Sequence, residues 1–219
     1  MYSIRDISHL INGVLLAAIC AATCTQASST VNITAGHING IPCSSTPAHA
    51  YLSIPFALPP VGSLRFAPTV AFNASYPSTG LDAVTKPKSC IQFGHEFLEP
   101  APWSEDCLYL NVWNPANVTS ASKLPVKFWI HGGAGNAGGS ANPLYDGCDL
   151  AGMGDQVVAS TNYRLGALGF MAAEEVGIDG NMGLQDILLA LSWVRDNIEA
   201  FGGDKVWNIS LLRKTWHSV

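Results

Sequence analysis

A nearly continuous apolar run that leads directly into a glycine-rich loop constrains this chain more than any other feature. Residues 126–130 read Val-Lys-Phe-Trp-Ile, and residues 131–138 read His-Gly-Gly-Ala-Gly-Asn-Ala-Gly. An apolar run of this kind is typical of a strand that is buried on both faces of a sheet. Residues 108–113 and 156–163 are further strand candidates. No helix-length segment clearly precedes each candidate, so we expect the sheet to begin with antiparallel strands.

The strongest helix signal lies between Met182 and Ala200. Its apolar side chains recur at steps of three and four and form one stripe, which comprises Leu184, Ile187, Leu188, Leu191, Val194 and Ile198. Asp179 or Asn181 is placed to cap the start of the helix, and Gly202-Gly203 closes its end. Buried strands followed by a helix predict an α/β fold.

Three other regions carry weaker structural signals. Residues 31–42 partly alternate between apolar and polar side chains and predict a short hairpin or meander. The stretch from Pro55 to about Pro102 is rich in proline and glycine and predicts long loops. After Asp204 the chain ends with no turn signal, and we expect this last segment to have no partner element in the sheet.

The first 27 residues have the features of a secretory signal peptide. Residues 10–22 are mostly apolar, too short to cross a bilayer, and lie behind Arg5. Thr25-Gln26-Ala27 follows as a small-residue cleavage site. The alternative is a buried helix of the domain. No later run is long enough for a membrane span, so we expect cleavage after Ala27 and secretion of residues 28–219.

Sequons, cysteines and charge are consistent with a secreted protein. The pattern Asn-X-Ser/Thr predicts N-glycosylation at Asn32, Asn73, Asn117 and Asn208. Cleavage after Ala27 leaves an even number of cysteines, which predicts disulfides with three alternative pairings of Cys43, Cys90, Cys107 and Cys148. No cysteine or histidine spacing fits zinc, so we expect no metal. A net charge of −5 without a basic cluster argues against nucleic acid as a partner.

Two functional interpretations compete for the glycine-rich loop. Gly133, Gly135 and Gly138 fit the dinucleotide pattern GxGxxG, but that pattern requires a helix directly after the glycines and an acidic residue ending the next strand. The sequence supports neither the helix nor the acidic residue that the dinucleotide pattern requires, so we expect no cofactor. The other interpretation is an oxyanion loop, whose backbone N–H groups stabilise the negative charge that develops on an ester carbonyl oxygen. An ordinary glycine-rich turn is the structural alternative.

Motifs outside the loop decide between these interpretations. Residues 104–115, Ser-Glu-Asp-Cys-Leu-Tyr-Leu-Asn-Val-Trp-Asn-Pro, closely resemble the signature of the type-B carboxylesterase/lipase family. Further motifs follow the family's order at residues 54–57, 129–133, 162–166, 180–186 and 201–204. Several ordered motifs together are far more specific than a single match. The resemblance covers roughly residues 31–204.

The resemblance implies an α/β-hydrolase fold with a mixed central sheet, and hydrolysis of a small-molecule or lipid ester. Family members use a Ser nucleophile, a His base and a Glu or Asp that orients the base. We accordingly expect residues 28–204 to form the N-terminal part of a carboxylesterase domain, and residues 205–219 to be a tail outside the family pattern. A non-catalytic binding module on the same fold is the alternative function.

The resemblance also assigns roles within the loop that starts at His131-Gly132. The N–H groups of Gly133 and Ala134 correspond to the family's oxyanion donors. Ala134 replaces the usual glycine and keeps its N–H, so the oxyanion hole survives if φ is negative, whereas a positive φ strains the loop. Gly135 replaces the usual aromatic residue, which would widen the acyl pocket.

The resemblance to the family also bears on the disulfides, on one ion pair and on a cation site. The resemblance implies a Cys90–Cys107 disulfide and an Arg65–Glu105 ion pair, whose alternative is two solvated surface charges. Cys43 and Cys148 are left as a candidate second bridge. Trp103 is the only tryptophan in the Cys90–Cys107 loop and directly precedes the signature, so we expect no cholinesterase-like cation site.

The family's nucleophile elbow, GxSxG, occurs nowhere in the sequence. In the family it follows Phe-Gly-Gly-Asp and a proline, and this chain has Lys205 at the proline position. We interpret this departure as a read-through intron or a shifted reading frame. We expect the 219-residue chain alone to lack esterase activity, because it carries no activated nucleophile.

Overall fold

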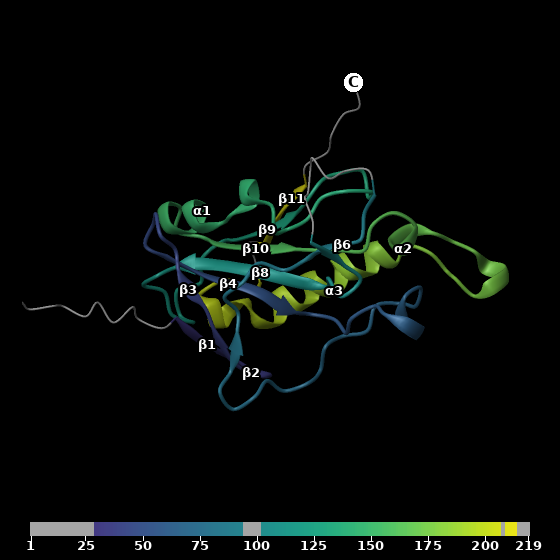
Figure 1. The fold of residues 1–219 in the computed structure, drawn as a ribbon. Helices are drawn as coiled ribbons and strands as arrows, with labels where there is room; N and C mark the ends of the chain where they lie inside the picture. The colour runs from purple at the N-terminus through teal and green to yellow at the C-terminus, as the bar shows by residue number, and fades with distance from the viewer. Residues whose placement is uncertain (1–28, 94–101, 207–208, 214–219) are drawn as a thin grey trace, which may run out of the picture.

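A mixed six-stranded sheet forms the centre of the molecule (Figure 1). The computed structural model describes residues 29–93 and 102–206 and the backbone of 209–213. The strand order is β11-β9-β10-β8-β4-β3. The strands are β3 (Ile41–Pro42), β4 (Ala48–Pro55), β8 (Tyr109–Pro115), β9 (Val126–Ile130), β10 (Val157–Thr161) and β11 (Ile209–Arg213). The pairs β3–β4, β4–β8 and β8–β10 are antiparallel, whereas the pairs β10–β9 and β9–β11 are parallel. This arrangement confirms the predicted mixed sheet with an antiparallel start.

Smaller elements surround this sheet. The predicted N-terminal hairpin consists of β1 (Thr30–Ile33) and β2 (Gly36–Asn39), and β5 (Leu81–Asp82) pairs with β2. A separate pair joins β6 (Ser89–Cys90) to β7 (Trp103–Ser104). The α-helices are α1 (Cys148–Met153), α2 (Gly166–Phe170) and α3 (Met182–Asn197). Short 3-10 helices occur at Gly62–Leu64, Pro143–Tyr145, Glu174–Val176 and Ile198–Phe201.

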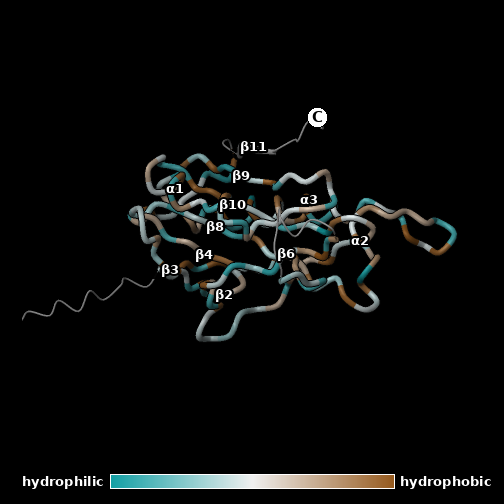
Figure 2. Tube along the Cα trace, turned by 45° about the horizontal axis from the view of Figure 1, so that its top comes forward, coloured by the Kyte–Doolittle hydropathy of each residue, from teal (hydrophilic) through white to brown (hydrophobic). Residues whose placement is uncertain are grey.

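The sheet is buried on both faces. Leu110 and Val112 of β8 pack with Phe128 of β9 in the core that α3 covers. Trp113 and Val158 belong to a second core on the other face, which α1 covers (Figure 1). Figure 2 shows the hydrophobic stretches along β4 and β10. Burying each large apolar side chain contributes about 1.5–3 kcal/mol, so these strands hold the loops at their ends in fixed positions.

Helix α3 buries a face that differs from the predicted stripe. Its buried residues are Met182, Gly183, Asp186, Ala190 and Val194. Leu184 and Leu188 of the predicted stripe are 50% and 55% exposed, so the prediction was wrong for them. The cause is Asp186, which is fully buried in an ion pair and turns its own face of the helix toward the sheet. A pattern of apolar residues contains no information about such a charge.

The C-terminal segment also differs from the expectation. The backbone of Ile209–Arg213 pairs in parallel with Val126–Ile130 of β9, so the expectation of no partner element was wrong. An unpaired edge of a buried strand attracts any extended segment that reaches it, which explains the pairing. Sequence analysis also missed β4, α1 and α2. The two helices are too short to show helical periodicity.

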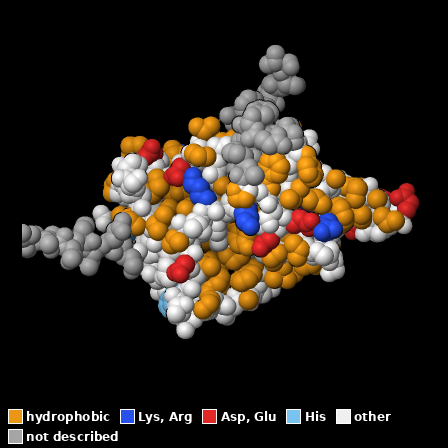
Figure 3. Space-filling model, in the orientation of Figure 1, with side chains coloured by type: hydrophobic (Ala, Val, Ile, Leu, Met, Phe, Trp, Pro, Cys, Tyr) orange, Lys and Arg blue, Asp and Glu red, His pale blue; other side chains and the backbone are white. Residues whose placement is uncertain are grey.

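A projecting loop lies away from this core. The loop that carries the 3-10 helix Glu174–Val176 extends from the end of α2, and acidic side chains mark its tip in Figure 3. Within residues 29–93 and 102–206, no helix is long and apolar enough to cross a membrane. The predicted signal peptide, residues 1–27, and the sequon at Asn208 lie outside the described residues.

Candidate functional site

The glycine-rich loop leaves the end of β9 as a tight turn. The N–H groups of Asn136 and Ala137 both donate to the carbonyl oxygen of Gly133, at 2.9 and 3.1 Å. Gly133 has a φ of 122°, and a Cβ built on it would lie 2.0 Å from the carbonyl oxygen of Ala137. Only glycine fits at that position. After Gly138 the chain continues through a turn instead of a helix, so the geometry that a dinucleotide site requires does not form.

Two adjacent N–H groups of this turn, those of Gly133 and Ala134, donate to no protein acceptor among the described residues. Gly133 is half-buried and Ala134 is exposed. Free N–H groups on a fixed backbone are suited to bind a negatively charged oxygen, because they need no reorganisation when the charge appears. In the part of the chain that the structure describes, the neighbouring amides of Gly132 and Gly135 also have no protein acceptor, so the role of Gly133 and Ala134 as oxyanion donors stays a prediction.

Ala134 adopts the strained conformation that the sequence analysis left open. Its φ is +55°, in the left-handed region. This conformation costs an L-residue about 1–2 kcal/mol relative to right-handed backbone. Ala134, one of the two residues whose N–H groups are predicted donors, is therefore conformationally strained.

We expect Ala134→Gly to raise the free energy of unfolding by about 1 kcal/mol, because glycine adopts a positive φ without the Cβ penalty. Urea denaturation of both proteins measures this difference. The matched control is Ala121→Gly, at an exposed residue with no positive φ, which should bring no such gain. A loss of stability in Ala134→Gly would contradict the strained geometry.

His131 anchors the start of the loop inside the protein. Its side chain is 2% exposed, and its ring stacks on Tyr163 with the ring centroids 4.4 Å apart. The Tyr163 hydroxyl donates to the carbonyl oxygen of His131 at 3.0 Å. Burial lowers the pKa of His131 to about 4, although the hydrogen bond from Nδ1 to the Gly132 carbonyl oxygen opposes this shift. His131 is thus a neutral support of the loop and has no open position as a general base.

We expect the buried His131 to make stability depend on pH between 6.5 and about 4. In this interval the unfolded chain binds a proton at His131 and the folded chain does not, so stability is complete above pH 6.5 and falls as the pH decreases. The slope should approach about 1.4 kcal/mol per pH unit. Urea denaturation at several pH values should show a flatter profile for His131→Gln. Burial also lowers the pKa of His49, but His49 contributes equally in the unmodified chain and in His131→Gln. Identical slopes of stability against pH in the two proteins would contradict the assignment to His131.

Two buried amide side chains hold the other end of the loop. The side chain of Gln92 donates to the carbonyl oxygen of Gly138 and accepts from the N–H of Gly138, both at 2.9 Å. The Oδ1 atom of Asn162 accepts from the N–H of Ser140 at 2.8 Å. Sequence reasoning missed both roles. Asn162 begins the family motif at residues 162–166, but neither a glutamine nor an asparagine carries a local signal that distinguishes a buried side chain from an exposed one.

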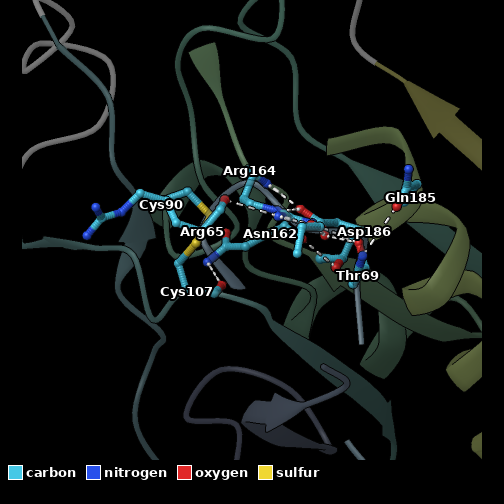
Figure 4. A network of polar contacts seen from close by, with 10 residues as sticks. Arg65, Thr69, Cys90, Cys107, Asn162, Arg164, Gln185 and Asp186 are labelled. Atoms are coloured by element: carbon cyan, nitrogen blue, oxygen red, sulfur yellow. Dashed lines mark hydrogen bonds and ion pairs between the residues drawn. A yellow bond between two sulfur atoms is a disulfide. The ribbon is translucent and has the colours of Figure 1, made fainter. Parts of the chain in front are cut away.

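A buried ion pair supports the backbone that follows β10 (Figure 4). The N–H and Nε of Arg164 both donate to Oδ2 of Asp186 at 2.9 Å, and Nη2 donates to Oδ1 at 2.8 Å. Arg164 also donates to the Ala67 carbonyl oxygen and to the Thr69 hydroxyl, both at 2.9 Å. The pair therefore ties α3 to the long N-terminal loop. This loop contains Arg65, whose Nε lies 2.8 Å from Oε2 of Glu105 in the ion pair that the family resemblance implies.

The cysteines form two disulfides. Cys90 is bonded to Cys107, the pairing that the family resemblance implies, and Cys43 is bonded to Cys148. The second bridge joins the start of α1 to the loop after β3. Of the four sequons, the three within the described residues have exposed asparagines, at Asn32, Asn73 and Asn117.

Comparisons with known proteins point to one family. The model of the carboxylesterase family matches residues 27–212. An acetylcholinesterase from Gallus gallus is 44% identical over 191 residues, which is 80% of this chain and 24% of that protein. Carboxylesterase 3 from Homo sapiens is 38% identical over 217 residues, which is 88% of this chain and 37% of that protein. A solved structure of a PNB esterase superposes with a TM-score of 0.77 at 37% identity, over 86% of this chain and 39% of that one. The chain thus spans about a quarter to two-fifths of the length of these proteins.

Proposed function

Because the chain belongs to the carboxylesterase family, we propose that it is the N-terminal part of a carboxylic-ester hydrolase and supplies two oxyanion donors. The observation that carries this proposal is the pair of N–H groups at Gly133 and Ala134. They have no acceptor among the described residues, on a turn that is anchored at both ends. An ordinary glycine-rich turn needs neither buried anchor, so the anchoring favours the oxyanion role.

The donors act when a serine attacks the ester carbonyl carbon. A bond forms from the serine oxygen to that carbon, a histidine base takes the serine proton, and the carbonyl electron pair moves onto oxygen. The two N–H groups donate to this oxyanion and lower the barrier. When this tetrahedral intermediate collapses, the bond between the carbonyl carbon and the alcohol oxygen breaks, and the alcohol leaves with the proton from the histidine. Water then attacks the acyl-enzyme by the same steps and releases the acid. Serine, histidine and acid would all come from sequence beyond residues 1–219.

We further propose that the mature protein, beginning at residue 28, is secreted and glycosylated at its sequons. Two disulfides support an oxidising compartment, and the exposed positions of Asn32, Asn73 and Asn117 leave them open to modification. The substrate would be a small-molecule or lipid ester. Gel mobility before and after treatment with an N-glycosidase tests the glycosylation of the secreted protein.

The purified 219-residue chain should not hydrolyse p-nitrophenyl acyl esters, because it lacks an activated nucleophile. A transcript that continues past the codon of Asp204 into a GxSxG motif should instead encode a protein that hydrolyses these esters. A serine-reactive phosphonate should abolish that activity. Phosphonate-sensitive turnover by the 219-residue chain, or a transcript without any downstream elbow, would contradict the proposal.

A non-catalytic binding module is the second candidate function. Residues 1–219 contain no GxSxG motif, and this observation fits both candidates. The same transcript separates the two candidates. An elbow whose serine is replaced supports the binding module, and an elbow with its serine supports the hydrolase.

A further inference from the structure

The end of the glycine-rich loop is held by an unusual set of contacts. Gln92 is 3% exposed and satisfies both the N–H and the carbonyl oxygen of Gly138 with one side chain. Asn162 is fully buried and binds the N–H of Ser140, two residues further along. Gly138 has a φ of 107°, and a Cβ on it would lie 2.5 Å from the carbonyl oxygen of Gly132. The end of the loop is therefore packed directly against its beginning.

Both amide side chains also bind the backbone of one disulfide. The Nε2 atom of Gln92 donates to the carbonyl oxygen of Cys90 at 3.2 Å. The Nδ2 atom of Asn162 donates to the carbonyl oxygen of Cys107 at 3.1 Å (Figure 4). Cys90 and Cys107 are joined to each other, so the two hydrogen-bonding paths start from a single crosslink. One path ends at Gly138 and the other at Ser140.

We propose that Gln92 and Asn162 are positioning residues for the oxyanion donors, and that the Cys90–Cys107 disulfide is their common support. Buried amide groups that lose their partners pay the full cost of desolvation, so this network resists small displacements. Gly138 transmits the restraint to Gly132, directly before the two donors. The disulfide thus fixes the donors in place, in addition to crosslinking the chain. This inference rests on the proposed function for its catalytic meaning, but the restraint itself can be measured without substrate.

The test compares Gln92→Met with Gln156→Met in the 219-residue chain. Methionine has a similar volume to glutamine and no hydrogen-bonding amide. Gln156 is also a buried glutamine, but its Nε2 donates to the Leu150 carbonyl oxygen, away from the loop. The readout is the ¹⁵N order parameter of the Gly133 and Ala134 amides, with the amides of β10 as a check of folding. If Gln92→Met does not fold, Gln92→Asn keeps the amide and shortens its reach.

In the unmodified chain and in Gln156→Met, the order parameters of Gly133 and Ala134 should be near 0.85, the value typical of rigid backbone. In Gln92→Met or Gln92→Asn they should fall below about 0.6 while β10 stays rigid. Mild reduction that opens Cys90–Cys107 should have the same effect. Unchanged order parameters in a folded Gln92 variant would overturn the inference.

A kinetic arm separates this inference from the proposed function. In a chain extended through its serine, Gln92→Met should lower kcat at least about tenfold with KM nearly unchanged, because misplaced donors weaken only the transition state. Gln156→Met should leave both values unchanged. If the extended chain hydrolyses no ester, the proposed function fails, yet the order parameters still decide whether Gln92 restrains the loop. If kcat is unchanged in a Gln92 variant, the positioning role is wrong and the hydrolase assignment stands.

Discussion

Replacing Asp186 by alanine should lower the free energy of unfolding by about 3–5 kcal/mol, because it leaves the guanidinium of Arg164 buried without its counter-charge. The Arg164 side chain is only 3% exposed, so water cannot replace the lost carboxylate. Four groups donate to the Asp186 carboxylate, the N–H, Nε and Nη2 of Arg164 and the hydroxyl of Thr69, and all four would lose that bond together. Urea or guanidinium denaturation, followed by circular dichroism, measures the loss.

Asp196 provides the matched control on the same helix. Its carboxylate pairs with Arg195, but both side chains are about 60% exposed. Exposed pairs of this kind contribute little to stability, so Asp196→Ala should leave the denaturation midpoint nearly unchanged. Equal effects of the two substitutions would contradict the assignment of Asp186 as a buried structural charge.

The second large effect is catalytic and concerns Gly133. In a chain extended through its nucleophile, Gly133→Ala should lower kcat about 10²–10³-fold, the usual cost of removing one oxyanion donor. The added Cβ would lie 2.0 Å from the Ala137 carbonyl oxygen, so the turn must open and its N–H groups must move. Steady-state kinetics with a p-nitrophenyl ester measure the change.

Gly177→Ala separates the loss of the donor from general backbone strain. Gly177 also has a positive φ, 76°, but a Cβ on it meets nothing within 4 Å, and it lies in the projecting loop. This control should lose some stability and keep kcat. A normal kcat in Gly133→Ala would show that this amide does not contribute to catalysis.

Local patterns predicted β8, β9 and β10 of the central sheet and missed β4. The apolar run at residues 126–130 became β9 with the same bounds, because a strand buried on both faces leaves a clear hydrophobic signal. The glycine-rich loop was predictable for a similar reason, since only glycine tolerates the close backbone contact at Gly133. The positive φ of Ala134 was not predictable, because alanine itself carries no preference for it.

Contacts between distant residues were less accessible from the sequence. The buried face of α3 depends on Asp186, whose partner Arg164 lies 22 positions away. Gln92 and Gly138 are 46 positions apart, and neither has a local pattern that points to the other. The pairing of β11 with β9 depends on which strand edge is open in the folded sheet. Such features are set by tertiary packing, which can override any local propensity.

Amide hydrogen exchange at Gly133 and Ala134 tests most directly whether two free, fixed donors are present on this loop. We predict that both amides exchange at nearly the unprotected rate, because neither has a protein acceptor among the described residues. The amides of Gly138 and Ser140 should be strongly protected, since Gln92 and Asn162 accept from them. Protection of Gly133 and Ala134 equal to that of Gly138 would mean that internal hydrogen bonds occupy both donors, and would contradict the account.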